Sequence, residues 1–381
     1  MQKNSKKVLI TIPWFHPAFR AGGPVQSIVN LVNNYDECSF YIVCGNTDLN
    51  KVPLLVETGK WLNFNDHTKV FYLAESRRSE AIVNLCNDVR PDVLMIIGIF
   101  SWHFNIVPLG FCKAGKKILS VRGMLHSEAR GQKPLKKKMY FALWKLFGLE
   151  HKAIFHATDD SEKQIVIDFF QEDLPVAVAA NYPRLFSPLP VKDKKEGFVV
   201  LASVALISPM KNILLVLQAL KSCSADVCYH IYGPVKDPAY WMLCKELIVT
   251  LPVNIKVQYH GELAPSGVEA ALESCHIFIL PSRSENFGHA HLEALSAGRP
   301  LISSNNIPWK KLEENKAGLN VNSTVEDLCK SIQFFAAMNF EELSEWSAAA
   351  GRYSKDAFSP EKIKDQYQNL FSSPSPTEQT R

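Results

Sequence analysis

The sequence predicts an α/β protein built from two doubly wound, Rossmann-like domains. Short apolar runs alternate with helical stretches, a pattern typical of parallel sheets that are covered on both faces. A charged stretch with several prolines interrupts this alternation near the middle of the chain, and a second alternating series follows it. The length of 381 residues also exceeds what a single hydrophobic core usually supports.

The first series of apolar runs predicts the sheet of an N-terminal domain at 1–183. Its runs are short and rich in β-branched and aromatic residues, which favours strands over helices. The predicted strands are 8–12, 40–43, 70–72, 93–97, 118–121 and 153–155. The stretch 184–197 combines prolines with a cluster of lysines, so we expect it to be the interdomain linker.

The second series predicts a C-terminal domain at 198–359. Its predicted strands are 198–201, 228–231, 255–259, 277–279 and 301–302. We expect the two domains to face each other across a cleft, and a helix at about 360–371 to pack back on the first domain. The tail 372–381 is polar and contains prolines, so we expect it to be disordered.

The composition is typical of a soluble globular enzyme, with 47% hydrophobic and 21% charged residues. No apolar run approaches the length of a membrane span. The first residues are polar and lead directly into a strand, without the apolar core of a signal peptide, so we expect a cytoplasmic protein. A net charge of +4 is too small to indicate nucleic-acid binding.

The nine cysteines are odd in number, scattered, and form no Cys-x-x-Cys pair. They are therefore predicted to be reduced thiols, several of them buried. No histidine pair stands at ligand spacing beside a cysteine pair, so we expect no structural metal.

The segment that bears most on function is a strand, a loop and a helix at 276–300. The apolar run 276–280 predicts a buried strand, and 287–297 predicts a helix that ends at Gly298. A second strand at 301–302 completes a βαβ unit. Such a unit points the N-terminus of its helix toward the crevice at the carboxyl end of the sheet, where unpaired N–H groups and the helix dipole favour a phosphate. Gly288 allows close approach of a ligand, and the amides of His289 and Ala290 follow it.

Two carboxylates flank this glycine: Glu285 and Glu293, with seven residues between them. In a continuous helix they would stand roughly 12 Å apart along the axis. A glycosidase pair stands roughly 5 to 9.5 Å apart across one bond, so we interpret these residues as contacting two ends of one ligand, Glu293 a ribose diol and Glu285 a sugar. The alternative is that Glu285 is only a helix-capping acid and Glu293 an ordinary solvated helix residue.

The wider segment, with PSRSENFGH at 281–289 and EALSAGRPLI at 293–302, resembles the nucleotide-sugar site of retaining glycosyltransferases. Most of the chain is similar to the GT-B glycosyltransferases of family 4 (glycosyl transferases group 1), particularly those of bacterial polysaccharide assembly. The resemblance implies a GT-B fold, a nucleotide diphosphate sugar on the C-terminal domain, and an acceptor on the N-terminal one. It also implies that Asn286 and Phe287 bind the donor, and that no separate cofactor is needed.

Two further matches lie in the first domain. The segment 13–27 looks like the family's first glycine-rich loop, in which Gly22 and Gly23 can bring backbone amides near a pyrophosphate or sugar. The alternative is a plain helix-entry turn. The segment 120–126 places Arg122 at a strand end, where its guanidinium can hold a phosphate or an acceptor hydroxyl. The alternatives are a surface ion pair for Arg122 and a structural or solvated role for His126.

Another match, 207–212, resembles the family segment whose lysine binds the donor diphosphate, and it assigns that role to Lys211. Relatives usually carry an arginine just before this segment, whereas this chain has Leu206. One phosphate contact is therefore expected to be missing, unless a basic residue elsewhere replaces it. The candidates are Arg20, Arg122 and Arg283. If none of these replaces the contact, we expect donor binding to be weaker than in typical relatives, or the protein to be non-catalytic.

The predicted reaction is transfer of a sugar to an acceptor hydroxyl with retention of configuration. Its catalytic residues would be Glu285, Lys211 and Arg122. Lys211, the amides at 288–290 and the helix dipole would stabilise the leaving diphosphate without a metal. The alternatives are a sugar-nucleotide epimerase of the same architecture and a degenerate, non-catalytic sugar-nucleotide-binding protein. A dehydrogenase is disfavoured because no G-x-G-x-x-G follows the first strand.

The acceptor is indicated only by 133–148, which combines a lysine cluster with aromatic residues. Helical spacing predicts that its core-facing stripe is Leu135, Met139, Ala142, Leu143 and Leu146. The lysines would then meet an anionic membrane surface together with Phe141 and Trp144. This would suit a glycan or lipid-linked acceptor, in polysaccharide or lipopolysaccharide assembly, and a peripheral location at the inner face of the plasma membrane. The alternative is a merely solvated basic face.

Overall fold

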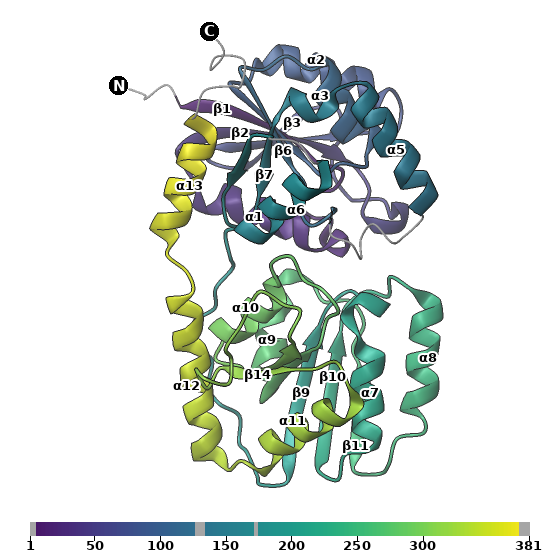
Figure 1. Cartoon of the computed structure of the whole chain (residues 1–381), viewed down its shortest axis with the longest axis vertical. Coiled ribbons are helices and arrows are strands. Elements are labelled where there is room, and N and C mark those ends of the chain that lie inside the picture. The colour runs from purple at the N-terminus through teal and green to yellow at the C-terminus, as the bar shows by residue number, and fades with distance from the viewer. Residues whose placement is uncertain (1–4, 126–133, 171–173, 373–381) are drawn as a thin grey trace. The chain divides into compact units, whose positions relative to one another are not determined.

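The computed structural model of the protein describes residues 5–125, 134–170 and 174–372 (Figure 1). The chain divides into two compact units. The first unit runs to Tyr182 and is completed by the chain from Pro360 onward, whereas the second unit spans Pro183–Ser359. The predicted tail 372–381 lies outside the described residues, except for Ser372.

The first unit is built on an eight-stranded sheet, counted over the described residues, with the order β3-β4-β2-β1-β5-β6-β7-β8. Its strands are parallel except β3, which pairs antiparallel with β4 as a hairpin. Central strands such as β5 are buried along their whole length, because helices cover both faces of the sheet. The strands are β1 (Lys6–Thr11), β2 (Cys38–Gly45), β3 (Trp61–Asn65), β4 (Thr68–Leu73), β5 (Val93–Ile97), β6 (Lys116–Ser120), β7 (Ile154–Ala157) and β8 (Val176–Val178).

The helices of the first unit connect these strands and close its core. They are α1 (Gly23–Asn34), α2 (Arg78–Val89), α3 (Val107–Phe111), α5 (Pro134–Leu146), α6 (Asp160–Phe170) and α13 (Pro360–Ser372). Shorter helical turns are η1 (Phe19–Ala21), η2 (Leu49–Lys51), η3 (Trp102–Ile106) and η4 (Leu149–Lys152).

Helix α13 comes from the far end of the chain and packs on the first sheet, as Figure 1 shows for the yellow end of the ribbon. Tyr367 is fully buried and its ring stacks on that of Tyr182, with centroids 5.5 Å apart. The ammonium of Lys116 donates to the carbonyl of Leu370 at 2.5 Å, which fixes the end of the helix against β6. The first unit is therefore assembled from two separate parts of the sequence.

The second unit is built on a fully parallel six-stranded sheet with the order β11-β10-β9-β12-β13-β14. Numbered within the unit, this order is 3-2-1-4-5-6, the strand order of a Rossmann fold. The order reverses between β9 and β12, which creates the topological switch point where such sheets bind ligands. The strands are β9 (Phe198–Val204), β10 (Asp226–Tyr232), β11 (Ile255–Tyr259), β12 (Ile277–Leu280), β13 (Leu301–Ser304) and β14 (Gly318–Val321).

The helices of the second unit pack on both faces of this sheet around one large apolar core. They are α7 (Ile213–Lys221), α8 (Pro238–Ile248), α9 (Val268–Glu273), α10 (His289–Ser296), α11 (Val325–Ala337) and α12 (Phe340–Asp356), with helical turns η5 (Pro209–Lys211) and η6 (Pro265–Gly267). No helix among the described residues is both long and apolar enough to cross a membrane.

The predicted α/β class with two Rossmann-like domains is confirmed, and every predicted strand overlaps an observed one. The observed strands β3, β8 and β14 were not predicted. The stretch 184–197 packs on the second unit rather than spanning freely, since the amide of Phe186 donates to Ser296 and that of Leu189 to the carbonyl of Ala297.

The predicted orientation of the helix at 133–148 is wrong. Trp144 is only 1% exposed, and the ring of Phe141 packs on Phe169 with centroids 4.6 Å apart, so these aromatics face the core. Met139 and Leu146, predicted to be core-facing, are 66% and 75% exposed. The aromatic side chains displace the smaller apolar ones because they bury more area per residue. Residue 133 and the side chains of 134–138 and 143 lie outside the description.

Candidate functional site

The loop between β12 and α10 lies at the carboxyl end of the second sheet. Gly288 ends this loop as the residue before α10, with a φ of 76° that favours glycine. A Cβ at this position would lie 3.0 Å from His291 Nδ1 and 3.1 Å from Trp309 Nε1, closer than ordinary contacts. The predicted helix therefore begins two residues later than expected, at His289 rather than Phe287, because the left-handed glycine separates loop from helix.

Hydrogen bonds fasten this loop to the one between β9 and α7. The amide of Arg283 donates to the carbonyl of Met210 at 2.8 Å, and the side chain of Asn212 donates to the carbonyl of Pro281 at 3.3 Å. Asn212 itself has a left-handed φ of 60° and starts α7. The two loops on either side of the switch point thus form one connected surface.

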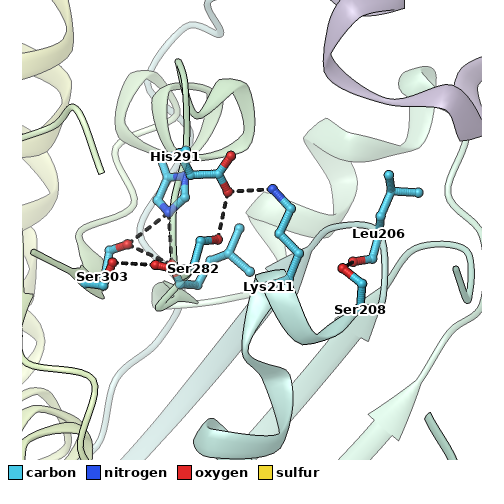
Figure 2. Close-up of polar contacts among 9 residues, drawn as sticks. Leu206, Ser208, Lys211, Ser282, His291 and Ser303 are labelled. Carbon is cyan, nitrogen blue, oxygen red and sulfur yellow. Dashed lines mark hydrogen bonds and ion pairs between the residues drawn. The ribbon is translucent and has the colours of Figure 1, made fainter. Parts of the chain in front are cut away.

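Lys211 and Glu285 meet across these two loops. The Lys211 ammonium lies 2.5 Å from Glu285 Oε1, and the Ser282 hydroxyl donates to the same oxygen at 2.7 Å, as Figure 2 shows. Their side chains are 22% and 13% exposed, so the pair is reachable from solvent but largely desolvated. The sequence placed both residues at one site, and the structure brings them together.

The carboxyl of Glu285 is held in its charged form. Burial alone would raise its pKa, but the charge of Lys211 and the hydrogen bonds from Lys211 and Ser282 outweigh burial and lower the pKa below the ordinary value. Glu285 does not cap α10, since the residue before the helix is Gly288. The alternative of a simple capping acid is therefore wrong.

His291 is fully buried, and the charges of Glu285 and Lys211 both act on it. Its Nε2 lies 3.0 Å from the carbonyl of Leu280 and 2.9 Å from the hydroxyl of Ser303 (Figure 2). A carbonyl only accepts, so Nε2 must carry the proton. Burial lowers the pKa of His291 despite the nearby Glu285 charge, so the ring is neutral and Nδ1 is an acceptor. Sequence reasoning did not select this residue, because a lone histidine on a helix carries no spacing signal.

Glu293 is also buried, at 6% exposure, so it is not an ordinary solvated helix residue. Its Oε1 accepts from Nε of Arg184 at 3.0 Å, and Nη2 of the same guanidinium lies 3.0 Å away. Burial raises the pKa of Glu293, and Arg184 opposes that rise. Arg184 was not predicted, because it stands in a proline-rich stretch that was interpreted as a linker.

The remaining predicted residues surround the start of α10. Phe287 packs its ring on His289, Trp309 and Phe358, with centroid distances of 4.6, 5.7 and 5.8 Å. This aromatic cluster holds the backbone around Gly288 in place. Asn286, His289 and Ala290 are each half-buried at the same edge of the unit.

Leu206 lies in the β9–α7 loop that also carries Lys211, and Figure 2 draws it on the side of Lys211 away from Ser282. Of the three arginines proposed to replace the missing contact, Arg283 is the one in the second unit. It is exposed, and its backbone is already bonded to the loop that carries Lys211. Arg20 and Arg122 belong to the first unit.

The predicted glycine-rich loop of the first unit forms the start of α1. Gly22 has a φ of 78° and precedes the helix, which begins Gly23-Pro24. The carbonyl of Gly22 accepts from the amides of Val25 and Gln26. This geometry fits a plain helix-entry turn. It is equally compatible with a glycine-rich loop whose backbone could contact a ligand, because the loop follows β1.

Arg122 is buried rather than part of a surface ion pair, being 8% exposed at the carboxyl end of β6. Its φ of 50° is unusual for a residue other than glycine. Its Nη1 donates to Asn181, whereas Nε and Nη2 have no partner among the described residues. Glu162 accepts from the amides of Gly123 and Thr158 in the same cluster. His126 lies outside the described residues.

Among the described residues, no three His, Cys, Asp or Glu side chains gather as they would to hold a metal ion. All nine cysteines are free thiols, seven of them buried.

Several solved structures of similar fold match nearly the whole chain. Sucrose-phosphate synthase from Thermosynechococcus elongatus superposes with a TM-score of 0.72 at 15% identity, covering 97% of this chain and 98% of that one. HepE from Anabaena, in complex with UDP and glucose, gives a TM-score of 0.69 at 13% identity, over 96% and 99%. WaaG, a glycosyltransferase of lipopolysaccharide biosynthesis, gives 0.63 at 12% identity, over 96% and 100%. The chain therefore has the GT-B fold.

Sequence comparison adds a narrower match. Residues 189–352 match the family Glycosyl transferases group 1, and this range lies within the second unit. The alpha-monoglucosyldiacylglycerol synthase of Streptococcus pneumoniae is 29% identical over 158 residues, which are 41% of this chain. The match spans only 35% of that protein's length.

Proposed function

We propose that the protein is a retaining glycosyltransferase that moves a sugar from a nucleotide diphosphate sugar to an acceptor hydroxyl. The observation that carries this proposal is the Lys211–Glu285 pair, 2.5 Å apart at the switch point of the second sheet and beside the start of α10. The group 1 match of this unit and the glycolipid synthase similar to it support the same reaction class.

The chemistry requires stabilising the charge that develops on the departing diphosphate. Lys211 provides a mobile positive charge, and the helix dipole at the start of α10 provides a partial one. Glu285 keeps Lys211 in place before the donor binds, and its carboxylate is then available to a sugar hydroxyl. None of these steps requires a metal, so we propose a metal-independent enzyme.

The acceptor would bind to the first unit. Arg122 is the strongest candidate, because two of its donor nitrogens are buried without a partner among the described residues. The guanidinium already donates to Asn181 and interacts with the Tyr367 hydroxyl, but buried donor nitrogens without a partner cost free energy unless a ligand pairs with them. An acceptor hydroxyl or phosphate would satisfy this need, and Gly22 and Gly23 lie in the same unit.

The membrane contact proposed for 133–148 would use a different face from the one predicted. Met139 and Leu146 lie two helical turns apart on one exposed face of α5, and Phe147 follows at 64% exposure. Lys145 and Lys152 are exposed close by in sequence. An apolar face beside lysines suits the surface of an anionic bilayer, and we propose cell-surface polysaccharide or lipopolysaccharide assembly there, with a glycan or lipid-linked acceptor.

Incubation with a panel of UDP-, GDP- and ADP-sugars tests the function. A transferase releases nucleoside diphosphate faster when membrane extract supplies the acceptor. An epimerase would convert the donor to its isomer with no acceptor present, and a non-catalytic protein would bind a donor without changing it. Either of the last two results would overturn the proposed function.

A further inference from the structure

Arg184 makes several contacts within the second unit, including an ion pair with the buried Glu293. Its Nε and Nη2 both lie 3.0 Å from one oxygen of Glu293, and its Nη1 donates to the carbonyl of Pro265 at 3.0 Å. The guanidinium also sits 4.8 Å from the centroid of the Phe186 ring. All these residues belong to the second unit, and Arg184 is the second residue of that unit.

These contacts fix the guanidinium from three sides, through a carboxylate, a carbonyl and an aromatic face. A planar guanidinium held in this way orients the carboxylate to which it donates. Both nitrogens converge on Oε1, while Oε2 of Glu293 meets no donor among the residues that the structure describes. The second oxygen is therefore the one left to accept a hydrogen bond.

Arg184 is also the charged group that acts on Glu293. The buried face of α12, which packs on α10, carries no titratable side chain. Glu269 on α9 is exposed, and His291 interacts with Glu285 and Lys211 rather than with Glu293. Burial raises the pKa of Glu293, and the neighbouring Arg184 opposes this rise.

We infer that Arg184 is a positioning residue for nucleotide recognition: it binds Oε1 of Glu293 and so presents Oε2 to a ribose hydroxyl of the donor. This inference rests on the proposed function, because it requires the nucleotide to bind at α10. It adds a residue from the start of the second unit to the nucleotide site.

The test measures nucleoside diphosphate affinity by isothermal titration between pH 5.5 and 8, using the diphosphate that binds best among UDP, GDP and ADP. Arg184→Met should weaken binding about tenfold at neutral pH. The loss should grow as pH falls, because without the guanidinium the pKa of Glu293 rises and its carboxylate becomes protonated. Arg184→Lys should restore the pH profile of the wild type, since it keeps the charge.

Two controls separate positioning from mere structural support. Arg352→Met removes an exposed arginine on α12 and should leave affinity and its pH profile unchanged. In the background of Glu293→Gln, Arg184→Met should have little additional effect, because the two residues act together. An equal loss at every pH, or a full additional loss in that background, would overturn the positioning role.

A ligand-free measurement distinguishes the outcomes further. Carbon-13 NMR of glutamate side chains, with the Glu293 signal assigned from Glu293→Gln, should show a higher pKa for Glu293 in Arg184→Met than in the wild type. If wild-type protein binds no nucleotide, the proposed function fails, and this inference fails with it. If nucleotide binds but neither the affinity profile nor the NMR titration moves, only the inference about Arg184 fails.

Discussion

The ammonium of Lys211 and the carboxylate of Glu285 lie 2.5 Å apart and join two loops from opposite sides of the sheet's switch point. Neither residue is near the other in sequence, so the fold alone brings them together. The pair places one positive and one negative group at the edge of the site, and without a ligand each is the ionic partner of the other. A diphosphate would compete with Glu285 for Lys211, and a sugar hydroxyl would compete with Lys211 for Glu285.

Lys211→Met should weaken nucleoside diphosphate binding about tenfold or more, because a charge-assisted contact is worth roughly 1.5 to 3 kcal/mol. It should also raise the pKa of Glu285, since Lys211 is the largest of the effects that lower it. The pH at which turnover falls on acidification should then move upward. Lys221→Met, at the exposed far end of α7, is the matched control. Unchanged affinity in Lys211→Met would remove the lysine from the phosphate site.

The two glutamates should have separable effects. Glu293→Gln should weaken nucleotide binding, whereas Glu285→Gln should reduce kcat more than nucleotide affinity, because they are assigned to opposite ends of the donor. Steady-state kinetics and calorimetry on both variants provide the comparison. Near-wild-type kinetics for both variants would contradict the assignment of the site.

Leu206→Arg should tighten nucleoside diphosphate binding roughly tenfold, if the added guanidinium reaches the phosphates that we propose Lys211 to bind. Leu206 is half-buried in the β9–α7 loop that also carries Lys211. Isothermal titration of the folded variant measures the effect. Unchanged or weaker binding would mean that another basic residue already fills that place, and Arg283 is the candidate that belongs to this unit.

Chelation should leave activity intact, because in the proposed mechanism Lys211 and the start of α10 provide the positive charge that a metal would otherwise supply. Transfer assayed in EDTA should match transfer without it. Complete loss that manganese or magnesium restores would contradict metal independence.

The exposed face of α5 should be required for membrane binding and dispensable for the donor. Leu146→Ser with Phe147→Ser should reduce cosedimentation with vesicles rich in phosphatidylglycerol several-fold, because each exposed apolar side chain contributes buried area in the bilayer interface. Nucleotide affinity should be unchanged. The matched control is Val249→Ser with Val253→Ser, which alters exposed apolar residues in the second unit. Equal sedimentation of both double variants would argue against a membrane role for α5.

The sequence predicted the parts of the fold that depend on apolar runs. It missed β3 and β8, whose side chains are largely half-buried and which therefore lack a continuous apolar run. The prediction assigned the wrong face of α5 to the core, because spacing alone does not tell which of two apolar stripes is larger. The aromatic stripe containing Phe141 and Trp144 buries more area.

The site was predictable where a motif fixed both residue type and spacing, as for Lys211, Gly288 and Glu285. Contacts between distant segments were not, because nothing near Arg184 in sequence indicates that it meets Glu293. The same holds for the hydrogen bond from Arg122 to Asn181, which joins the ends of separate strands. Such pairs depend on the topology of the sheet, which the local sequence pattern does not reveal.

Helix α13 has a consequence for how the protein is made. A ribosome delivers the strands of the first unit early, yet the helix that covers Tyr35, Tyr182 and β8 is delivered only after the entire second unit. Until then the first unit exposes an apolar surface, whereas the second unit can complete its core as soon as it emerges. A nascent chain stalled before Pro360 should therefore hold a folded second unit beside an incomplete first one, which is where a chaperone would be needed.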